Sequence, residues 1–519
     1  MKDRGKVSFI AYQDQENLGI GYLTSMLLAK GFDVEIIDFR LPKEEILRQL
    51  KKADPLIVGF SLIFQYYVEK LRKLVQYLRE HSVACHFTVG GHYPSLRYYE
   101  VLNIIPDLDS VVRFEGENTI CELAEGLIAG KDWRKIKGMA YRLHDKPVSN
   151  ELRPLIKDLD TLPFPFREKG KEYKCMDKVY HTILASRGCV RNCSFCSIRK
   201  FYGTPRGQIR RTRSPYNVSK EMQKLYTEYK TRIFLFQDDD FFLPGRLGEK
   251  WVLDFIAALE AEGLANKILW KINCRPDEVN LDLFSKLKKV GLYLTYLGIE
   301  TGNQTGLKVL NKKLSLDDSV TSVRVLNQLG ISYEFGFMLF DPSSTFQSIK
   351  DNLTFLRKIC GDGSAPVVFC KMIPYAETDI ERQLKEENRL KGSVENPDYD
   401  FLDPKVDRLC TFLHHAFYNW MFTSEGMLAK LRWHRFEVVV LKKFYPQVKN
   451  ISEYEEFLRG IIASSNQLFL NIAEESASIY EDYKSSSEYQ LSSLTELLNT
   501  ELRKIDINLY NGMLQFQTT

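Results

Sequence analysis

The stretch Cys189–Val190–Arg191–Asn192–Cys193–Ser194–Phe195–Cys196 places three cysteines within eight residues, at Cys-x3-Cys-x2-Cys spacing. A structural zinc ion or a complete iron–sulfur site normally takes four protein ligands. The nearest other cysteines, Cys175 and Cys274, lie outside this motif. Three thiolates on one tight loop can hold three irons of a [4Fe–4S] cluster and leave the fourth iron open to a small molecule. The alternative interpretation is a partial zinc knuckle.

The composition is that of a globular protein with more than one domain. The chain has 519 residues, of which 44% are hydrophobic and 27% charged, so two to four domains are expected. A net charge of +4 gives no global argument for a nucleic acid or an anionic membrane as partner. No apolar run approaches the roughly 18 residues of a membrane span, and the N-terminus lacks an apolar signal segment. Ten cysteines in so long a chain are not a disulfide framework, and we expect a cytoplasmic, reducing location.

Residues 1–130 show regular alternation of strands and helices. Apolar, β-rich runs are expected to form strands at 6–12, 32–39, 56–62, 83–89 and 110–114, with helix-period segments between them. This alternation with short connections predicts a doubly wound parallel sheet, an α/β fold that binds ligands at the carboxyl ends of its strands. The loops at those ends are therefore the expected binding region, and their glycines let the backbone approach a ligand closely. Taken alone, the pattern fits any flavodoxin-like module.

The rest of the chain divides into three further regions. Residues 131–178 form a linker with a small β-hairpin and the proline-stiffened stretch Leu162–Phe166. Residues 179–394 contain six predicted strands, each with its helix, which make a partial (β/α)6 barrel open on one side. Residues 395–519 are expected to be helical and to cover that open side.

Acidic residues follow the predicted barrel strands. Gln237–Asp238–Asp239–Asp240 ends one strand, and adjacent carboxylates repel each other without a cation or donors nearby. Arg275 is either a bidentate carboxylate clamp or a surface salt-bridge partner. The basic run from Arg206 to Arg213 is expected to be solvated or to face a carboxylate, with RNA phosphates as the alternative.

The cysteine motif, with the aromatic Phe195 before its third cysteine, resembles the signature of the radical SAM enzymes. In that family the open iron binds S-adenosylmethionine, and an electron from the cluster yields a 5′-deoxyadenosyl radical. The N-terminal loops resemble those of the cobalamin-dependent members at Asn17–Gly19, Gly90–Pro94 and Gly116–Glu117.

The resemblance implies three sets of site residues. The cluster ligands are Cys189, Cys193 and Cys196. Contacts to S-adenosylmethionine are expected from Phe195, Gln237, Asp238, Asp239, Arg275 and Glu300. Contacts to cobalamin are expected from Glu16, Asn17, Leu18, Gly19, Ser61, Leu62, Phe64, Gln65, Gly90, Gly91, Gly116 and Glu117.

Two departures from the family pattern are informative. Cobalamin proteins with a histidine lower ligand carry Asp-x-His-x-x-Gly, whereas this chain has Glu16 at the histidine position. We therefore expect cobalt without a histidine lower ligand, shielded by residues 62–65; His92 is a substitute ligand or a support for the turn after the fourth strand. The segment Pro374–Thr378 lacks the family's Pro-Gly pair, so any contact of that glycine is in doubt.

The resemblance implies a methyltransferase that moves a methyl group from methylcobalamin to an unactivated carbon. A cobalamin-dependent radical SAM cyclase or oxidoreductase is the alternative enzyme, and a non-catalytic corrinoid or SAM sensor is the alternative of another class. Expected partners are a small-molecule or peptide substrate and an electron donor such as flavodoxin or ferredoxin. The substrate and the oligomeric state are not written in these residues.

Overall fold

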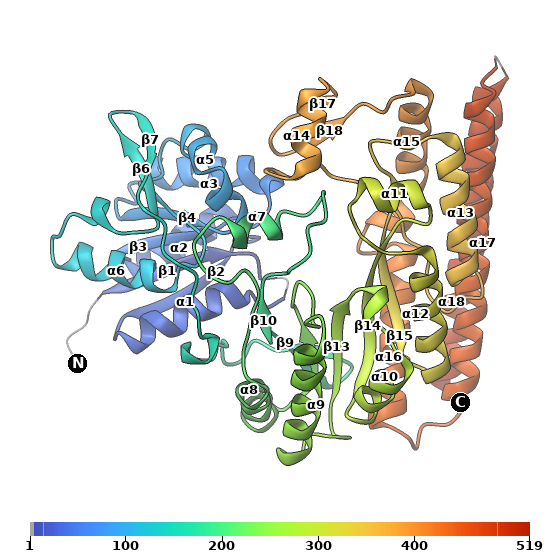
Figure 1. The fold of residues 1–519 in the computed structure, drawn as a ribbon, viewed down its shortest axis with the longest axis horizontal. Helices are drawn as coiled ribbons and strands as arrows, with labels where there is room; N and C mark the ends of the chain where they lie inside the picture. The colour runs from blue at the N-terminus through green and yellow to red at the C-terminus, as the bar shows by residue number, and fades with distance from the viewer. Residues whose placement is uncertain (1–4, 14, 485, 519) are drawn as a thin grey trace. The chain divides into compact units, whose positions relative to one another are not determined.

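The chain divides into two compact units (Figure 1). The computed structural model describes residues 5–13, 15–484 and 486–518, and Asp14 of the first predicted loop lies outside them. The first unit comprises Met1–Glu172, Thr182–Glu221 and Pro374–Asp398, and the second comprises Tyr173–His181, Met222–Ile373 and Tyr399–Thr519. The domain boundaries expected from the sequence, 1–130, 131–178, 179–394 and 395–519, stay a prediction.

The first unit is built on a sheet of order β2-β1-β3-β4-β5-β6-β7. Its parallel strands are β1 (Lys6–Ala11), β2 (Asp33–Asp38), β3 (Ile57–Ser61), β4 (His86–Gly90) and β5 (Ser110–Val112). The predicted α/β fold with a parallel sheet is confirmed. The expected hairpin is β6 (Met139–Leu143) and β7 (Lys146–Ser149). It extends the sheet, because β6 pairs antiparallel with β5 and β7 pairs antiparallel with β6.

Helices cover both faces of this sheet, as Figure 1 shows. They are α1 (Leu18–Ala29), α2 (Lys43–Ala53), α3 (Val68–Glu80), α4 (His92–Leu96), α5 (Tyr98–Ile104) and α6 (Glu117–Ile128). Alternate residues of β1 point to opposite faces, as in any strand. Val7 and Phe9 pack with α1 and α6, whereas Ile10 packs with α2, α3 and α5. Burial of both faces explains why the strands read as continuous apolar runs.

Short elements complete the first unit. They are β10 (Ser186–Arg187), β11 (Arg211–Thr212), α7 (Ile198–Gly203), the start of α8 (Pro215–Glu228), α14 (Asp379–Glu386), β17 (Leu390–Gly392) and most of β18 (Pro397–Tyr399). The strands β10 and β11 pair antiparallel and lie directly before and after the cysteine loop and α7.

The second unit is built on a sheet of order β16-β15-β14-β13-β12-β9-β8. The strands are β8 (Tyr173–Cys175), β9 (Lys178–Ile183), β12 (Thr231–Phe236), β13 (Leu269–Cys274), β14 (Leu292–Glu300), β15 (Ser332–Phe340) and β16 (Cys370–Lys371). From β12 to β16 the neighbours pair in parallel, and β8 pairs antiparallel with β9. The edge strands do not pair with each other, so the barrel is open, as predicted.

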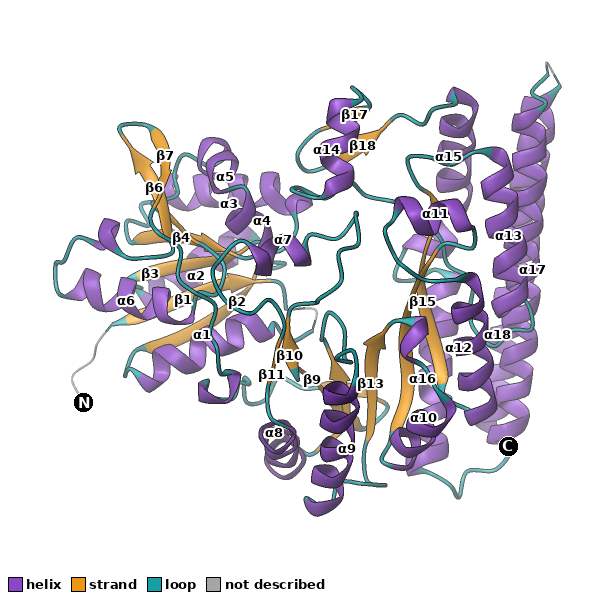
Figure 2. Cartoon of the chain, viewed as in Figure 1, coloured by secondary structure: helices purple, strands orange, loops and turns teal. Residues whose placement is uncertain are grey.

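Helices α9 (Arg246–Ala261), α10 (Leu281–Lys289), α11 (Gln304–Val309), α12 (Leu316–Leu329) and α13 (Phe346–Cys360) follow the barrel strands (Figure 2). The C-terminal helices are α15 (Pro404–Phe417), α16 (Met427–Phe444), α17 (Ile451–Glu481) and α18 (Ser487–Thr518), and a π-helical turn, Tyr418–Phe422, follows α15. The predicted helical character of this region is confirmed. None of the helices in the described ranges is long and apolar enough to span a membrane.

The helix α16 packs onto the barrel sheet. Its Phe436 ring stacks on Tyr293 of β14, with ring centroids 5.6 Å apart. Its Val440 is fully buried in one apolar cluster with Ile233 of β12 and Leu269 of β13. The helix α16 thus covers part of the barrel sheet, and the expected cover of the barrel's open side stays a prediction.

Candidate active site

The three cysteines lie on one loop that its ends hold in place. Gly188 precedes the loop at φ +82°, and a Cβ there would lie 2.1 Å from the carbonyl oxygen of Ile209, so only glycine fits. The guanidinium of Arg210 donates to the Gly188 carbonyl at 2.8 Å. The backbone N–H of Ile380 donates to the Ser194 carbonyl at 3.1 Å. The loop is therefore anchored at its start and near its centre.

The donor set of this loop fits an iron–sulfur cluster. Cys189, Cys193 and Cys196 are half-buried, and none of the ten cysteines, each within the described residues, forms a disulfide. The Arg191 N–H donates to the Cys189 sulfur at 3.4 Å. Among the described residues, no group of three His, Cys, Asp or Glu has the arrangement that binds a single metal ion. A cluster does not require such convergence, because each thiolate binds its own iron.

Five cysteines outside the loop are poor thiolate donors. Burial raises the pKa of Cys175 to about 12 and holds the pKa of Cys274 well above its usual value. Burial also raises the pKa of Cys85 and Cys121 to about 11, and that of Cys370 to about 12. A thiol with so high a pKa stays protonated at neutral pH and binds metal weakly.

The loops after β1, β3 and β4 meet at one edge of the sheet. Asn17 caps α1 by accepting from the Ile20 N–H at 3.1 Å, and its amide nitrogen lies 3.5 Å from the Ser61 hydroxyl. Gly91 has φ +119°, and a Cβ there would lie 2.4 Å from the Leu62 carbonyl oxygen. The Leu62 N–H donates to the Gly90 carbonyl at 2.8 Å. The structure thus brings together the predicted residues of these three loops.

Glu16, which stands at the position of a lower-ligand histidine, is engaged by protein groups. Its carboxylate accepts from the Thr182 N–H at 2.8 Å and from the Thr182 hydroxyl at 3.1 Å, and it pairs with Arg167 at 3.1 Å. Burial raises the pKa of Glu16, and Arg167 opposes that rise. His92 stacks on Phe201 with ring centroids 4.0 Å apart, and burial lowers its pKa to about 4. This stacking agrees with a support role for His92.

The loop after β3 presents an aromatic patch, which we define as Phe64, Tyr66 and Tyr375. Phe64 is 41% exposed, and its ring lies 5.1 Å from Tyr66 and 5.9 Å from Tyr375, centroid to centroid. Gln65 is buried, and both ends of its amide are satisfied: it donates to the Val394 carbonyl at 2.8 Å and accepts from the Ala376 N–H at 2.9 Å. Sequence reasoning missed Tyr375, since nothing in its own segment indicates this contact.

The loop after β5 carries a buried charged network of Glu115, Glu117, Arg187 and Arg211. Arg187 pairs with Glu117 at 2.6 Å and with Glu115 at 3.0 Å, and Arg211 pairs with Glu115 at 2.9 Å. Of this network only Glu117 was among the predicted site residues. Its Oε2 is buried and has no hydrogen-bond partner in the described residues, so it can accept from a ligand. This unused acceptor, at the carboxyl end of a strand, suits a hydrogen bond from one of the amide N–H groups that surround a corrin ring.

Solvation, one of the two expectations for the basic run, is wrong for three of its members. Arg210, Arg211 and Arg213 are each 3% exposed, not solvated. Arg213 pairs with Glu221 at 2.5 Å, and Arg211 pairs with Glu115. Their partners lie elsewhere along the chain and already occupy these guanidiniums, so this run does not offer them to RNA phosphates. Arg206 alone of the named arginines is exposed.

The carboxyl ends of the barrel strands hold the remaining predicted residues. After β12, Gln237 is half-buried, Asp238 is fully buried and Asp239 is exposed. The Asn273 amide of β13 donates to the Asp238 carbonyl at 2.9 Å. The buried carboxyl of Asp240 faces Glu278, and burial, with Asp240 as the next cause, raises the pKa of Glu278 to about 8. A carboxyl–carboxyl pair of this kind holds a proton at neutral pH.

Arg275 and Glu300 end β13 and β14. Arg275 is 5% exposed and forms a two-pronged pair with Asp277 at 2.9 and 3.2 Å, so the surface salt bridge considered from the sequence is in fact a buried one. Glu300 has φ +71° and pairs with Lys312 at 3.2 Å. Asn352 of α13 holds the turn beyond it, because its side-chain oxygen accepts from Thr301 and Gly302.

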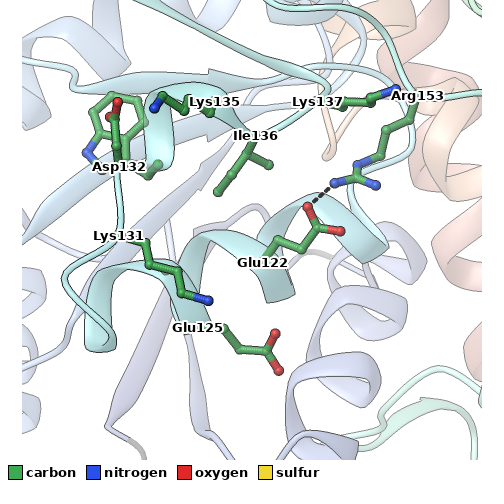
Figure 3. Close-up of a pocket in the computed structure, with 10 residues that line it drawn as sticks. Glu122, Glu125, Lys131, Asp132, Lys135, Ile136, Lys137 and Arg153 are labelled. Atoms are coloured by element: carbon green, nitrogen blue, oxygen red, sulfur yellow. Dashed lines mark hydrogen bonds and ion pairs between the residues drawn. The ribbon is translucent and has the colours of Figure 1, made fainter.

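A pocket in the first unit lies away from these loops (Figure 3). Apart from Ile136, the wall residues labelled in Figure 3 are charged, and Arg153 pairs with Glu122. The pocket borders the second half of α6, whereas the predicted Glu117 begins that helix. It contains none of the predicted site residues.

Two family models match the chain in the order expected. The B12 binding domain matches residues 9–124, and the Radical SAM superfamily matches residues 183–356. The chain belongs to the cobalamin-dependent radical SAM enzymes. Its cofactors are a [4Fe–4S] cluster, S-adenosylmethionine and cobalamin.

Named relatives of this enzyme include methyltransferases and cyclases. It is 28% identical over 349 residues to an uncharacterized methyltransferase of Pyrococcus horikoshii, which covers 66% of this chain and 73% of that protein. It is 27% identical over 346 residues to the anaerobic magnesium-protoporphyrin IX monomethyl ester cyclase of Cereibacter sphaeroides, covering 64% and 55%. It is 25% identical over 371 residues to the hopanoid C-3 methylase of Methylococcus capsulatus, covering 70% and 68%.

Two solved structures share the fold. The cobalamin-dependent radical enzyme OxsB, with aqua-cobalamin and S-adenosylmethionine bound, has a TM-score of 0.70 at 17% identity and covers 99% of this chain and 84% of OxsB. The radical methyltransferase TsrM of Kitasatospora setae, with tryptophan and an analogue of S-adenosylmethionine bound, has a TM-score of 0.62 at 18% identity, covering 74% and 76%.

Proposed function

We propose that this enzyme is a methyltransferase that moves a methyl group from cobalamin to an unactivated carbon of a small molecule or peptide. One observation carries the proposal: the loop with the three cysteines belongs to the same compact unit as the four candidate cobalamin loops. Methyltransferases among the named relatives support the methyl-transfer step. A flavodoxin or ferredoxin is the proposed electron donor.

When bound, the cluster with S-adenosylmethionine supplies a 5′-deoxyadenosyl radical, and cobalamin supplies the methyl group. The chain's part is to bind, orient and exclude water. Cys189, Cys193 and Cys196 are the proposed cluster ligands. Phe195 flanks them, and Gln237, Asp238, Asp239, Arg275 and Glu300 are the proposed contacts to S-adenosylmethionine. Because Arg275 is already paired with Asp277, its proposed contribution is to orient that carboxylate and the loop after β13.

Cobalamin would be held at the carboxyl edge of the first sheet. Asn17 and Ser61 tie two of its loops together, and Gly19, Gly90, Gly91 and Gly116 are the proposed glycine contacts. A Cβ at Gly91 would lie 2.4 Å from the Leu62 carbonyl oxygen and one at Gly116 2.9 Å from the Val112 side chain, so these two glycines let the protein segments pack closely together. The exposed ring of Phe64, backed by Tyr66 and Tyr375, is the proposed apolar cover of one corrin face. Leu18 and Leu62 are buried beneath these loops and support them. The first loop has Glu16 at the position of a lower-ligand histidine. Arg167 and Thr182 hold the Glu16 carboxylate.

The test is anaerobic purification and reconstitution, followed by quantification of iron, sulfide and corrin and by an assay of S-adenosylmethionine cleavage. We expect Cys193→Ala to abolish the brown chromophore and the release of 5′-deoxyadenosine while leaving corrin uptake intact. Cys85→Ala, which removes a half-buried thiol of the same unit, is the matched control and should behave as wild type. Retained S-adenosylmethionine cleavage in Cys193→Ala would refute the assignment.

The second candidate is a cyclase or oxidoreductase with the same cofactors. It is favoured by the likeness to the magnesium-protoporphyrin cyclase. The mass of the product separates the two, because methyl transfer adds one CH2 unit and cyclisation or oxidation adds none. A corrinoid or S-adenosylmethionine sensor would bind its ligands without releasing 5′-deoxyadenosine.

A further inference from the structure

The charged network of Glu115, Glu117, Arg187 and Arg211 is almost entirely removed from solvent. The side chains of these residues are 7%, 5%, 10% and 2% exposed. Glu115 also accepts from the Ile156 N–H at 2.7 Å, and Arg211 donates to the Ile156 carbonyl at 2.8 Å. The Arg187 guanidinium lies over the Tyr22 ring at 4.9 Å. The network therefore has defined partners on several elements of the first unit.

Burial makes the pairing in this network obligatory. A buried ion is strongly unfavourable unless its partners compensate the lost hydration. Burial alone would lower the pKa of Arg187, but Glu117 and Glu115 raise it above its usual value. Burial alone would raise the pKa of Glu115, yet Arg187 and Arg211 hold it below its usual value. Removing Arg187 leaves Glu117 without its cation. The position of Arg187 is therefore fixed by its ion pairs as well as by packing.

The network joins the loop after β5 to the strand that leads into the cysteine loop. On one side, Glu115 and Glu117 flank Gly116 in the loop between β5 and α6. On the other side, Arg187 ends β10 and stands two residues before Cys189, with the conformationally restricted Gly188 between them. Arg187 and Arg211 are direct partners in the β10–β11 pair. Only Gly188 separates Arg187 from Cys189, so the ion pairs of Arg187 also restrict where Cys189 lies relative to the loop after β5.

We propose that Arg187 is a positioning residue, which holds the start of the cysteine loop at a fixed place against the Glu115–Glu117 loop and so sets the spacing between cluster and corrin. This inference rests on the proposed function, because it takes the cysteine loop as the cluster site and the Glu115–Glu117 loop as a corrin contact. A radical step followed by methyl transfer requires reacting groups held within about 0.5 Å of their productive geometry. Two cofactors on separate loops need a rigid connection for this.

Loss of Arg187 should loosen the loop without unfolding it. The centre of the loop keeps its bond from the Ile380 N–H to the Ser194 carbonyl, and its start keeps the bond from Arg210 to Gly188. The segment that carries Ile380 is in turn fixed by Arg97, which pairs with Glu377 at 2.8 Å and Glu381 at 2.7 Å. Within the cysteine loop, the effect of an Arg187 variant is therefore expected to be largest at the first residues.

The first readout is hydrogen–deuterium exchange of peptides covering residues 188–197 in the full-length protein without cofactors. We expect Arg187→Met to speed exchange in this stretch about tenfold or more, which corresponds to about 1.4 kcal/mol of local opening. Arg187→Lys keeps the charge but cannot reach two carboxylates with one planar fork, so it should lie between wild type and Arg187→Met. Glu117→Gln, which retains the shape of the carboxylate, should change exchange in the same direction.

The matched control is Arg79→Met. Arg79 is also largely buried in the first unit and pairs with Asp109 at 2.7 Å, but it contacts neither the cysteine loop nor the Glu115–Glu117 loop. It should leave exchange of residues 188–197 unchanged. Unchanged exchange in Arg187→Met, or an equal rise in Arg79→Met, would overturn the role of Arg187.

The second readout uses the reconstituted enzyme. Pulsed electron paramagnetic resonance measures the distance between reduced cluster and cob(II)alamin, and we expect a broader distance distribution in Arg187→Met than in wild type or Arg79→Met. An unchanged distribution in a fully loaded Arg187→Met would overturn the inference alone. A wild-type protein that takes up neither iron nor corrin would instead overturn the proposed function.

Discussion

At the scale of single residues, Glu16 shows how a side chain can exclude one mode of cofactor binding. Its carboxylate is occupied by Arg167 and by two groups of Thr182. The nearest alternative among the sequence candidates, His92, stacks flat on Phe201 with an interplanar angle of 4°. Imidazole coordination would require this ring to leave its stacked position.

We therefore expect cobalamin in this enzyme to lack a nitrogen ligand from histidine. The electron paramagnetic resonance spectrum of bound cob(II)alamin should show no splitting that depends on a histidine nitrogen. His92→Ala should leave that spectrum unchanged, since the ring supports the protein and not the metal. A nitrogen splitting that disappears in His92→Ala would contradict this prediction.

The carboxyl pair of Asp240 and Glu278 should make stability depend on pH. Because the pKa of Glu278 is raised in the folded state, from 4.5 to about 8, its contribution to the free energy of unfolding is complete below about pH 4.5 and is lost as pH rises through about 8. Glu278→Gln stays neutral throughout, so we expect it to gain stability relative to wild type between about pH 5 and about pH 8.

Urea unfolding at the two pH values measures this difference. Asp282→Asn removes an exposed carboxylate from the start of α10 and serves as the control, with the same offset from wild type at both pH values. An offset for Glu278→Gln that does not change with pH would show that the pair is not protonated in the folded state.

At the scale of elements, the turn after β4 determines how three loops meet. Gly91 has φ +119° and ψ −174°, a conformation open essentially to glycine alone. The Leu62 carbonyl lies where its Cβ would be. The loop after β3 can approach this closely only because the side chain is absent.

Gly91→Ala should therefore cost stability and cobalamin affinity together. Strain of this backbone region is worth about 1–3 kcal/mol, and the contact with Leu62 adds to it by displacing the β3 loop. Gly130→Ala is the control, because Gly130 also has positive φ but open space around its Cβ position. Thermal unfolding and a corrin-binding titration measure both effects. Equal losses in the two variants would show that backbone strain alone is responsible.

Sequence patterns predicted the elements well and the polar partnerships poorly. The parallel sheet, the open barrel and the meeting of Asn17 with Ser61 follow from alternation and from the common edge of parallel strands. The burial of Arg211 was missed, because its partner Glu115 stands 96 residues earlier in the chain. The contact of Tyr375 with Phe64 was missed for the same reason. Periodicity reports which side of an element is apolar and carries no information about long-range ion pairs.

At the scale of the whole molecule, the proposed cofactor contacts divide between the units. The three cysteines and the cobalamin loops belong to the first unit, whereas Asp238, Arg275 and Glu300 belong to the second. Each set is held by contacts within its own unit. Loss of a contact in the second unit should therefore leave the cofactor content of the first unit intact.

Glu300→Gln tests this separation. It preserves the side-chain shape and the strained backbone at φ +71° but removes the charge. We expect the affinity for S-adenosylmethionine to fall about 10- to 100-fold, the value of one charged hydrogen bond, while iron and corrin contents stay at wild-type levels. Calorimetric titration and metal analysis provide the measurements, with the exposed Glu249→Gln of α9 as control. Loss of corrin in Glu300→Gln would contradict the division.

The raised pKa values of five cysteines outside the loop give the cluster-free protein a use as a chemical probe. Alkylating reagents attack thiolates, and Cys85, Cys121, Cys175, Cys274 and Cys370 hold their protons at neutral pH. Brief iodoacetamide treatment should therefore mark the half-buried loop thiols first. In samples taken during reconstitution and then treated briefly, the fall in labelling of these thiols would follow cluster insertion, because a thiolate bound to iron is protected from alkylation.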